Sequence, residues 1–265
     1  MKASLIITTY NSPVALEKVL DSVLFQKRRP DEVVIADDGS GEETAAVVRA
    51  FGGRVSFPVL HVRQENMGFR AAMIRNKAVE RSSGDYIIIL DGDCIINRYF
   101  VGDHAALAEK GHFIQGKRIL VNKKALPSFD FRTANSVAAL ITLAATGGIS
   151  NVHHLVRMPF FPAVSNRKLK GIKSCNMSFF RKDLEAVNGF NEDFVGWGNE
   201  DSDLACRFFT YGLLKKVHPF MMVCFHLWHP TNKSVNTYNR QLLRAAMASG
   251  EYFCRNGLRK QAGGS

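Results

Sequence analysis

Two short stretches of the sequence carry residue types that can bind a metal ion. Asp91 and Asp93 are one residue apart in a DGD triplet that follows an apolar run. Carboxylates at this spacing can face one small volume, where Mg²⁺ or Mn²⁺ takes their oxygens and bridges to substrate phosphates. His226 and His229 in the stretch FHLWHP are further ligand candidates. The pattern predicts a divalent metal, Mn²⁺ or Mg²⁺, with at least one of these histidines among its ligands.

A third stretch, GWGNEDSD at residues 196–203, combines acids with glycines and an indole. Acidic side chains are favoured in the first turn of a helix, which explains the acids but not the two glycines around Trp197. Glycine permits close approach of a ligand, and the indole offers an apolar face to a sugar ring. An aspartate at a helix N-terminus stays ionised at neutral pH, as a general base must be.

The elements that position these residues alternate along the first half of the chain. Apolar runs predict strands at residues 3–8, 32–36, 59–62 and 86–90, with helices between them at 13–24, 42–51 and 69–81. This order predicts an α/β fold with a parallel sheet covered by helices on both faces. Ligands bind at the carboxyl ends of such strands. Four polar stretches follow these strands: TTYN, DDGS, NMGFR and DGD. Together they predict one binding edge.

The second half is less regular, with expected strands at 174–181 and 216–225 and helices at 199–211 and 236–254. Residues 133–152 carry no charge, but their polar residues and Gly-Gly pair favour a buried helix over a membrane span. No repeat or low-complexity linker separates the halves. We therefore expect residues 1–125 and 126–265 to form two halves of one compact domain.

Composition excludes a disordered or fibrous chain, because 46% of the 265 residues are apolar and 22% are charged. Five scattered cysteines predict reduced thiols in a cytoplasmic protein, and the apolar run at the N-terminus is too short for a signal peptide. The formal net charge is +11, and residues 131–182 contain no Asp or Glu. Such a basic segment suggests an anionic partner: nucleic acid, a membrane surface or an acidic substrate.

In this order and spacing, TTYN, DDGS, NMGFRAAMIRN, DGD and GWGNEDSD resemble the motifs of family 2 inverting glycosyltransferases, which use nucleotide sugars and have the GT-A fold. The second half is similar to the carboxyl-terminal module shared by β-1,4-galactosyltransferases and bacterial chondroitin polymerase. The resemblance implies a Rossmann-like nucleotide-sugar-binding half at 1–125 and a smaller acceptor-binding, catalytic half at 126–265. It extends from Thr8 to His229, most of the chain.

The resemblance also implies roles in the nucleotide-binding half. Uridine would be cradled by Thr8, Tyr10 and Asp38, with Asp38 facing the uracil. Asn66 and Arg75 would contact the base or the diphosphate.

The same resemblance implies a metal site. Asp91 would touch the ribose or reach the metal through water, and Asp93 would bind the metal directly. His226 fits the family's histidine ligand best, with His229 as the second choice.

In the catalytic half, Asp201 matches the general base, Glu200 a contact to the donor sugar, and Trp197 a residue stacking near both sugars; Asp203 receives no role. The implied reaction moves a hexose or N-acetylhexosamine from a UDP-sugar to a hydroxyl of a glycan or lipid-linked glycan, with inversion, in bacterial-type surface polysaccharide or lipopolysaccharide synthesis.

Two other functions remain open from the residues alone. A nucleotidyltransferase also uses a parallel sheet and acidic metal site, but it usually needs a glycine-rich basic loop near the first strand, which TTYNSP is not. A non-catalytic carbohydrate- or nucleic-acid-binding module would leave the DGD, EDSD and histidine residues unexplained. Since no RNA- or DNA-binding motif is present, we expect no nucleic-acid partner.

The segment from Arg157 to Lys173 places Phe160 and Phe161 between prolines and beside clustered cations. Apolar rings next to cations suit the interface of an anionic membrane. We expect a cytoplasmic enzyme that is peripheral on the inner face of the membrane, with this segment by the acceptor side of the cleft and in contact with lipid or an anionic glycolipid. The alternative is that both phenylalanines are core residues and the cations form a solvated face.

Overall fold

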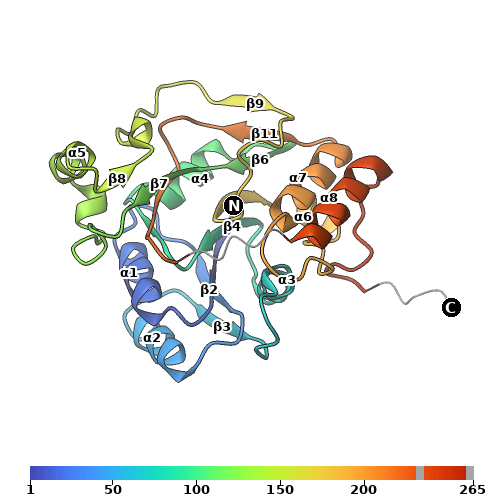
Figure 1. The fold of residues 1–265 in the computed structure, drawn as a ribbon, viewed down its shortest axis with the longest axis horizontal. Helices are drawn as coiled ribbons and strands as arrows, with labels where there is room; N and C mark the ends of the chain where they lie inside the picture. Colours follow the sequence, from blue (N-terminus) through green and yellow to red (C-terminus); the bar gives the residue numbers. More distant parts are fainter. Residues whose placement is uncertain (231–235, 261–265) are drawn as a thin grey trace.

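The computed structural model describes residues 1–230 and 236–260 (Figure 1). Its first half contains β1 (Ala3–Thr9), α1 (Pro13–Leu24), β2 (Glu32–Asp37), α2 (Glu42–Gly52), β3 (Val59–Arg63), α3 (Ala71–Arg81), β4 (Tyr86–Asp91), β5 (Cys94–Ile96), α4 (Phe100–Leu107), β6 (His112–Gln115) and β7 (Lys117–Val121). The second half contains α5 (Val137–Ala145), β8 (Ile149–Ser150), β9 (Val164–Asn166), β10 (Asn176–Phe180), α6 (Arg181–Ala186), α7 (Glu200–Tyr211), β11 (Leu214–Val217), β12 (Val223–His226) and α8 (Thr237–Ser249), with short 3-10 turns at Thr133–Asn135 and Val152–His154.

An eight-stranded sheet with the order β3-β2-β1-β4-β10-β6-β11-β9 forms the centre of the molecule. Strands β1 to β4 are parallel, as the alternating strand and helix pattern predicts. Strand β10 runs antiparallel to both β4 and β6. Because β10 comes from the second half of the sequence, the sheet draws its strands from both halves.

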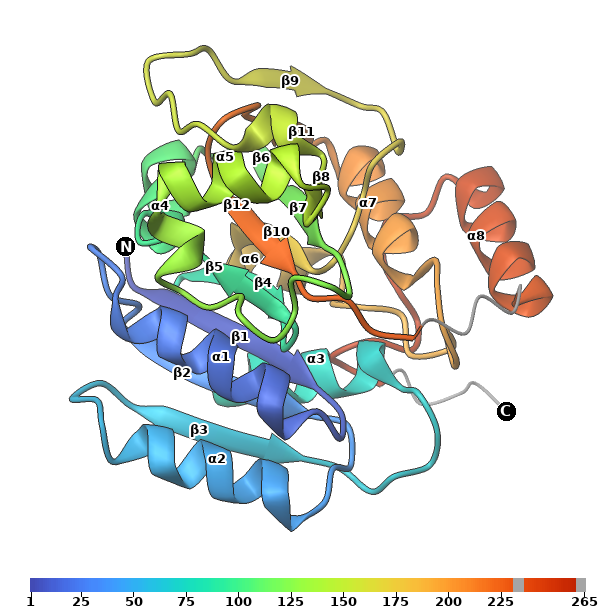
Figure 2. The same cartoon turned by 60° about the vertical axis from the view of Figure 1, so that its left-hand side comes forward.

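Alternation within β1 explains why helices cover both faces of this sheet. Leu5 and Ile7 belong to the core cluster that includes α1 and α2, whereas Ile6 belongs to the cluster that includes α3 and α7. Figure 2 shows α1 and α2 together against one face of β1, β2 and β3. Consecutive side chains of a strand point to opposite faces, so the apolar run at residues 5–7 needs cover on both sides of the sheet.

A four-stranded sheet, β5-β12-β7-β8, brings the histidine stretch to the DGD triplet. Strand β12 runs antiparallel to β5, with His226 opposite Cys94. The single strand expected at residues 216–225 is wrong, because β11 ends at Val217 in the large sheet and β12 begins at Val223 in the small one. Between them the chain turns at Met222, whose φ is +54°.

The prediction of a buried helix within residues 133–152 is also wrong, because the helix found there is mostly exposed. Helix α5 covers only Val137–Ala145, and Leu140 is its one buried residue. It packs on β8, the edge strand of the small sheet, so only one side of the helix has a partner. Val137 is 59% exposed. None of the helices within residues 1–230 and 236–260 has the length and apolar character needed to cross a membrane.

Candidate active site

The carboxyl ends of parallel strands bring the expected nucleotide-binding motifs together. Thr8 on β1 pairs with Asp91 on β4, and the backbone N–H of Gly92 donates to the Thr8 carbonyl at 2.7 Å. Asn66 donates to the Tyr10 hydroxyl at 2.9 Å. Gly39 adopts φ +94°, and a Cβ there would lie 2.6 Å from the Asn66 backbone nitrogen. The DDGS and NMGFR loops therefore meet in a contact that only glycine allows.

Asp38 is buried and anchors the loop that follows β3. Its Oδ1 accepts from Gln64 Nε2 at 2.5 Å, and its Oδ2 accepts from the Arg70 backbone N–H at 2.8 Å. The carboxylate expected to face uracil thus also fixes the loop that carries Asn66 and Arg70. This structural task was not expected from the sequence.

Arg75 on α3 is buried at 3% side-chain exposure and connects three site motifs. Its guanidinium donates to Thr8 Oγ1 at 3.2 Å, to Asp91 Oδ1 at 3.2 Å and to Glu200 Oε1 at 3.0 Å. A buried cation of this kind needs carboxylate partners, and the two carboxylates in turn need the cation. Arg75 therefore holds the motifs expected to bind the nucleotide against α7.

Asp93, His226 and His229 form a compact donor set, with all their ligand atoms within 4.8 Å of one another. Asp93 Oδ2 lies 3.4 Å from His226 Nε2 and 3.2 Å from His229 Nε2. Although burial by itself raises the pKa of Asp93, the His229 hydrogen bond and the two imidazoles outweigh it and lower that pKa. The Asp93 hydrogen bond raises the pKa of His229 to about 9, whereas burial lowers that of His226.

The donor set fits a divalent metal. His229 Nδ1 lies 3.0 Å from the Pro230 carbonyl, which accepts the Nδ1 proton and leaves Nε2 facing Asp93. Such a contact behind the ligating nitrogen is the usual way that a metal-binding histidine is oriented. The backbone N–H of Leu227 donates to the Asp93 carbonyl at 2.9 Å, which fixes the histidine stretch to the DGD turn. The structure brings both candidate histidines to Asp93 rather than choosing between them.

Asp201 lies in the first turn of α7 and faces the loop before β10. Its Oδ2 accepts from the Ser174 backbone N–H at 3.3 Å, and its Oδ1 accepts from the Ser202 backbone N–H at 2.6 Å. A helix N-terminus favours an ionised carboxylate. Burial and the neighbouring charge of Glu200 outweigh this and raise the pKa of Asp201 to about 6. The group is therefore ionised at pH 7 but more basic than a solvated aspartate.

Gly196, Gly198, Asn199 and Asp203 of GWGNEDSD have roles in the backbone turn and in the core. Gly196 and Gly198 adopt φ +78° and +100°, and Asn199 also has positive φ. A Cβ at Gly198 would meet no protein atom within 4 Å, so the left-handed backbone rather than packing against the protein favours glycine there. Asp203 is buried and pairs with Arg207 at 2.8 Å, which explains why it has no place among the catalytic acids.

A cavity of about 370 Å³ opens beside Asp201. Arg75, Asp91, Glu200 and Trp197 also line it, and the Trp197 side chain is 65% exposed. The cavity therefore presents a carboxylate base, an exposed indole and a charged network in one space. This arrangement suits proton removal from a bound hydroxyl.

The sequence profile of glycosyl transferase family 2 matches residues 4–183. The chain belongs to this family. A second profile, described as the N-terminal domain of galactosyltransferase, matches residues 162–229. Hyaluronan synthase of Pasteurella multocida is 30% identical over 230 residues, which are 79% of this chain and 23% of the synthase. Chondroitin synthase of Escherichia coli is 27% identical over 223 residues, 79% of this chain and 32% of that protein. The chain thus spans about a quarter to a third of these relatives.

Solved structures confirm the GT-A fold of this family 2 chain. TarS from Staphylococcus aureus, in complex with UDP-GlcNAc, superposes with a TM-score of 0.69 at 18% identity, covering 94% of this chain and 67% of TarS. The mannosyltransferase PcManGT from Pyrobaculum calidifontis, in complex with GDP-Man and Mn²⁺, gives 0.58 at 21% identity, covering 92% of this chain and 61% of that one.

Several residues that line the cavity of the family 2 chain were not expected from the sequence. Arg118 on β7, Lys173 and Ser174 come from segments without a motif, and Arg240 comes from α8. The lack of acids in residues 131–182 and the expected place of residues 157–173 by the acceptor side of the cleft marked part of this region, including Lys173, in advance.

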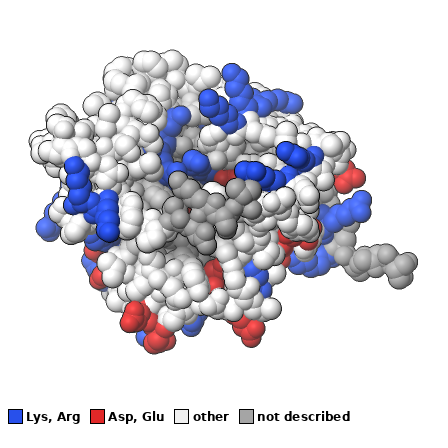
Figure 3. All heavy atoms as spheres, viewed as in Figure 1, with Lys and Arg blue, Asp and Glu red and all other residues white. Residues whose placement is uncertain are grey.

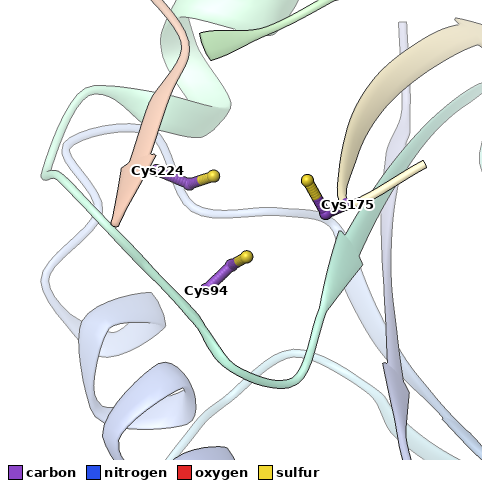
Figure 4. A group of neighbouring side chains, drawn as sticks. All are labelled: Cys94, Cys175 and Cys224. Carbon is purple, nitrogen blue, oxygen red and sulfur yellow. The ribbon is translucent and has the colours of Figure 1, made fainter. Parts of the chain in front are cut away.

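Three buried thiols lie next to the candidate metal ligands. Cys94, Cys175 and Cys224 point toward one another, with their sulfur atoms within 4.8 Å (Figure 4). Cys94 follows Asp93, and Cys175 follows Ser174. All five cysteines are free thiols. The cluster fills the interior where the two sheets meet, and so it supports the positions of both Asp93 and Ser174.

Proposed function

We propose that the chain transfers a hexose or N-acetylhexosamine from a UDP-sugar to a hydroxyl of a glycan or glycolipid acceptor, with inversion, in surface polysaccharide or lipopolysaccharide synthesis. The observation that carries this proposal is the Asp201 carboxylate, which faces a cavity shared with Asp91, Arg75 and Trp197. Relatives named as hyaluronan and chondroitin synthases, and a similar fold solved with UDP-GlcNAc, support the substrate class.

In this proposal Asp201 accepts the proton of the acceptor hydroxyl. The acceptor oxygen then forms a bond to the anomeric carbon from the face opposite the diphosphate, and the bond to the diphosphate oxygen breaks with its electron pair leaving on UDP. One displacement inverts the configuration, so an α-linked donor gives a β-glycoside. Arg75 orients Asp91 and Glu200 beside the donor, and Trp197 offers its indole to a sugar ring.

A divalent metal, Mn²⁺ or Mg²⁺, would be held by Asp93, His226 and His229. When bound it stabilises negative charge on the leaving diphosphate. The carboxylate and imidazole donors fit such an ion.

The test is UDP release with UDP-Glc, UDP-Gal, UDP-GlcNAc and UDP-GalNAc, each with and without Mn²⁺ and a glycan acceptor. Acceptor-dependent release from one of these donors supports the proposal. Transfer of a nucleotidyl group, or binding of sugars with no UDP release from any donor, would favour the two alternative functions.

We also propose that residues 157–173 contact an anionic membrane surface. Phe160 is 83% exposed and Phe161 is 46% exposed, which contradicts the alternative that both are core residues. Arg157 does not belong to the exposed cations, because it pairs with buried Asp103 at 2.6 Å. Salt-sensitive sedimentation with anionic liposomes, lost when Phe160 and Lys168 become Ser, supports this contact; sedimentation unaffected by these changes contradicts it.

A further inference from the structure

A second, smaller cavity of about 190 Å³ adjoins the one that holds Asp201. Arg118, Lys173 and Cys175 line both cavities, so the two lie side by side. The smaller cavity is strongly basic: its lining includes Lys117, Arg118, Lys170, Lys173 and Lys215. Figure 3, viewed as in Figure 1, shows Lys and Arg side chains gathered in a band above the centre of the molecule.

No carboxylate neutralises these cations within residues 1–230 and 236–260. No Asp or Glu lines the smaller cavity, and Lys117, Arg118, Lys170 and Lys173 form no ion pair in the described part of the chain. Residues 231–235 and 261–265 contain no Asp or Glu.

Other enclosed cations of the molecule do have carboxylate partners. Arg207 pairs with Asp203, and Arg75 pairs with Asp91 and Glu200. Unpaired positive charge in an enclosed site is costly, so a cavity of this composition favours an anionic occupant.

The cavity is also rigidly built. Gln115 accepts from the Lys173 backbone N–H at 2.9 Å and donates to the Lys173 carbonyl at 3.1 Å, which ties the loop of residues 170–175 to β6. Lys215 is only 4% exposed, and its ammonium donates to the Lys168 carbonyl and, at 3.0 Å, to the Lys170 carbonyl. Burial lowers the pKa of both Lys117 and Lys215. Backbone hydrogen bonds thus fix the loop of residues 170–175 and the Lys215 ammonium beside the cavity.

The position of the cavity argues against the nucleotide as its occupant. Asp93, His226 and His229 do not line it, nor do Thr8, Tyr10 and Asp38. The smaller cavity instead adjoins the larger one, in which Asp201 is proposed to accept the proton of an acceptor hydroxyl. An acceptor that places its hydroxyl by Asp201 can extend an acidic group into the smaller cavity.

We infer that the smaller cavity binds a carboxylate or phosphate group of the acceptor, and that the acceptor is therefore an acidic glycan or glycolipid. The identification of the anion as part of the acceptor rests on the proposed function. The binding of an anion in the smaller cavity does not depend on it. Carboxylate and phosphate share the chemistry that recognises them: charge-assisted hydrogen bonds from Lys and Arg.

The experiment is calorimetric titration of glucuronate, inorganic phosphate and neutral glucose into the full chain saturated with UDP and Mn²⁺. Lys117→Gln and Lys170→Gln are the test variants because both residues line only the smaller cavity. Lys182→Gln is the matched control, since Lys182 is exposed, lies outside residues 157–173 and lines neither cavity. Thermal unfolding checks that each variant folds.

We expect wild type to bind glucuronate or phosphate but not glucose, and each test variant to bind the anion at least about tenfold more weakly. UDP affinity should be unchanged in all variants. With active enzyme, the preference for a uronate-terminated acceptor over its carboxyl-reduced form should fall in the test variants only. The comparison of glucuronate with phosphate then indicates whether the acidic group of the acceptor is a carboxylate or a phosphate.

Three results would overturn the inference: no anion binding by wild type, equal loss in Lys182→Gln, or loss of UDP affinity in Lys117→Gln, which would assign the cavity to the donor. Failure of the proposed function is distinguishable, because it would appear as absence of UDP binding and transfer while anion titration still reports on the cavity.

Discussion

Arg75 and Glu200 form a buried ion pair at 3.0 Å that joins α3 of the first half to α7 of the second. The same guanidinium also faces Asp91, so one cation balances two carboxylates at the carboxyl edge of the sheet. Neither residue could be paired with the other from local sequence patterns. Their contact ties the side of the cavity built by the first half to the side built by the second half.

Replacing Arg75 with Met should therefore lower both stability and transfer. Two carboxylates would remain close together without their cation, at a cost of about 3–5 kcal/mol in the free energy of unfolding. Urea denaturation measures this cost. Arg54→Met is the matched control, because Arg54 pairs with Asp21 at the surface and its loss should leave the unfolding midpoint unchanged. Equal midpoints for wild type and Arg75→Met would contradict the linking role of this residue.

Asp201→Asn should retain UDP binding and lose turnover. The amide keeps the shape of the side chain but cannot accept the acceptor proton, so kcat should fall by about 10²–10⁴. Calorimetry with UDP and a UDP-release assay separate binding from chemistry. Glu17→Gln, at an exposed position of α1, is the control for a change of one charge. If turnover of Asp201→Asn stays near wild type, Glu200 becomes the candidate base.

The pH dependence of kcat/KM should show an acidic limb set by Asp201, whose pKa is raised to about 6. Below that pH the base is protonated, so kcat/KM should fall about tenfold per pH unit, and above it the profile should level off. The measurement needs saturating Mn²⁺, so that protonation of His226 and His229 does not contribute. Because the charge of Glu200 raises this pKa, Glu200→Gln should shift the limb of its residual activity to lower pH. A profile flat from pH 5 to pH 8 would exclude Asp201 as the base.

The fold was largely predictable because its first half follows local rules. The apolar runs of β1 to β4 and the helices between them lie close to the expected residues, since buried parallel strands have a strong pattern. The last helix was expected to reach Cys254, but it ends at Ser249, where Gly250 takes φ +67°. The failures concern segments whose structure depends on distant partners, such as the turn between β11 and β12.

Candidate site residues could be predicted where they lie at strand ends or in motifs. They could not be predicted where pairing between distant strands brings them together. Asp93 and the two histidines could be named, but only the pairing of β12 with β5 explains why both histidines reach the same carboxylate. Arg118 was missed for the same reason, because its place beside Cys224 comes from the pairing of β7 with β12. No periodicity within either segment reports such a contact.

Removal of the divalent metal should abolish transfer reversibly. EDTA should stop UDP release, and added Mn²⁺ should restore it. His226→Ala and His229→Ala should each weaken Mn²⁺ affinity on the order of 10² or more, because both imidazoles face Asp93 and even residues that only orient a metal ligand contribute 10–100-fold. His112→Ala, remote from the set, is the control. Full activity in EDTA would exclude the metal, and loss in only one histidine variant would identify the ligand.

Gly39→Ala should disturb the nucleotide-binding edge without touching any charged group. Gly39 has φ +94°, and an added Cβ would lie 2.6 Å from the backbone nitrogen of Asn66, which cannot move without moving the loop tied to Asp38. The strained backbone alone costs on the order of 1–3 kcal/mol, so the melting temperature and the UDP affinity should both fall. Gly52→Ala is the matched control, because its Cβ would meet nothing within 4 Å and Gly52 ends helix α2 without positive φ. If Gly39→Ala binds UDP as wild type does, the DDGS and NMGFR loops are not part of the nucleotide site. If it loses UDP affinity while the melting temperature holds, their contact shapes that site directly rather than through overall stability.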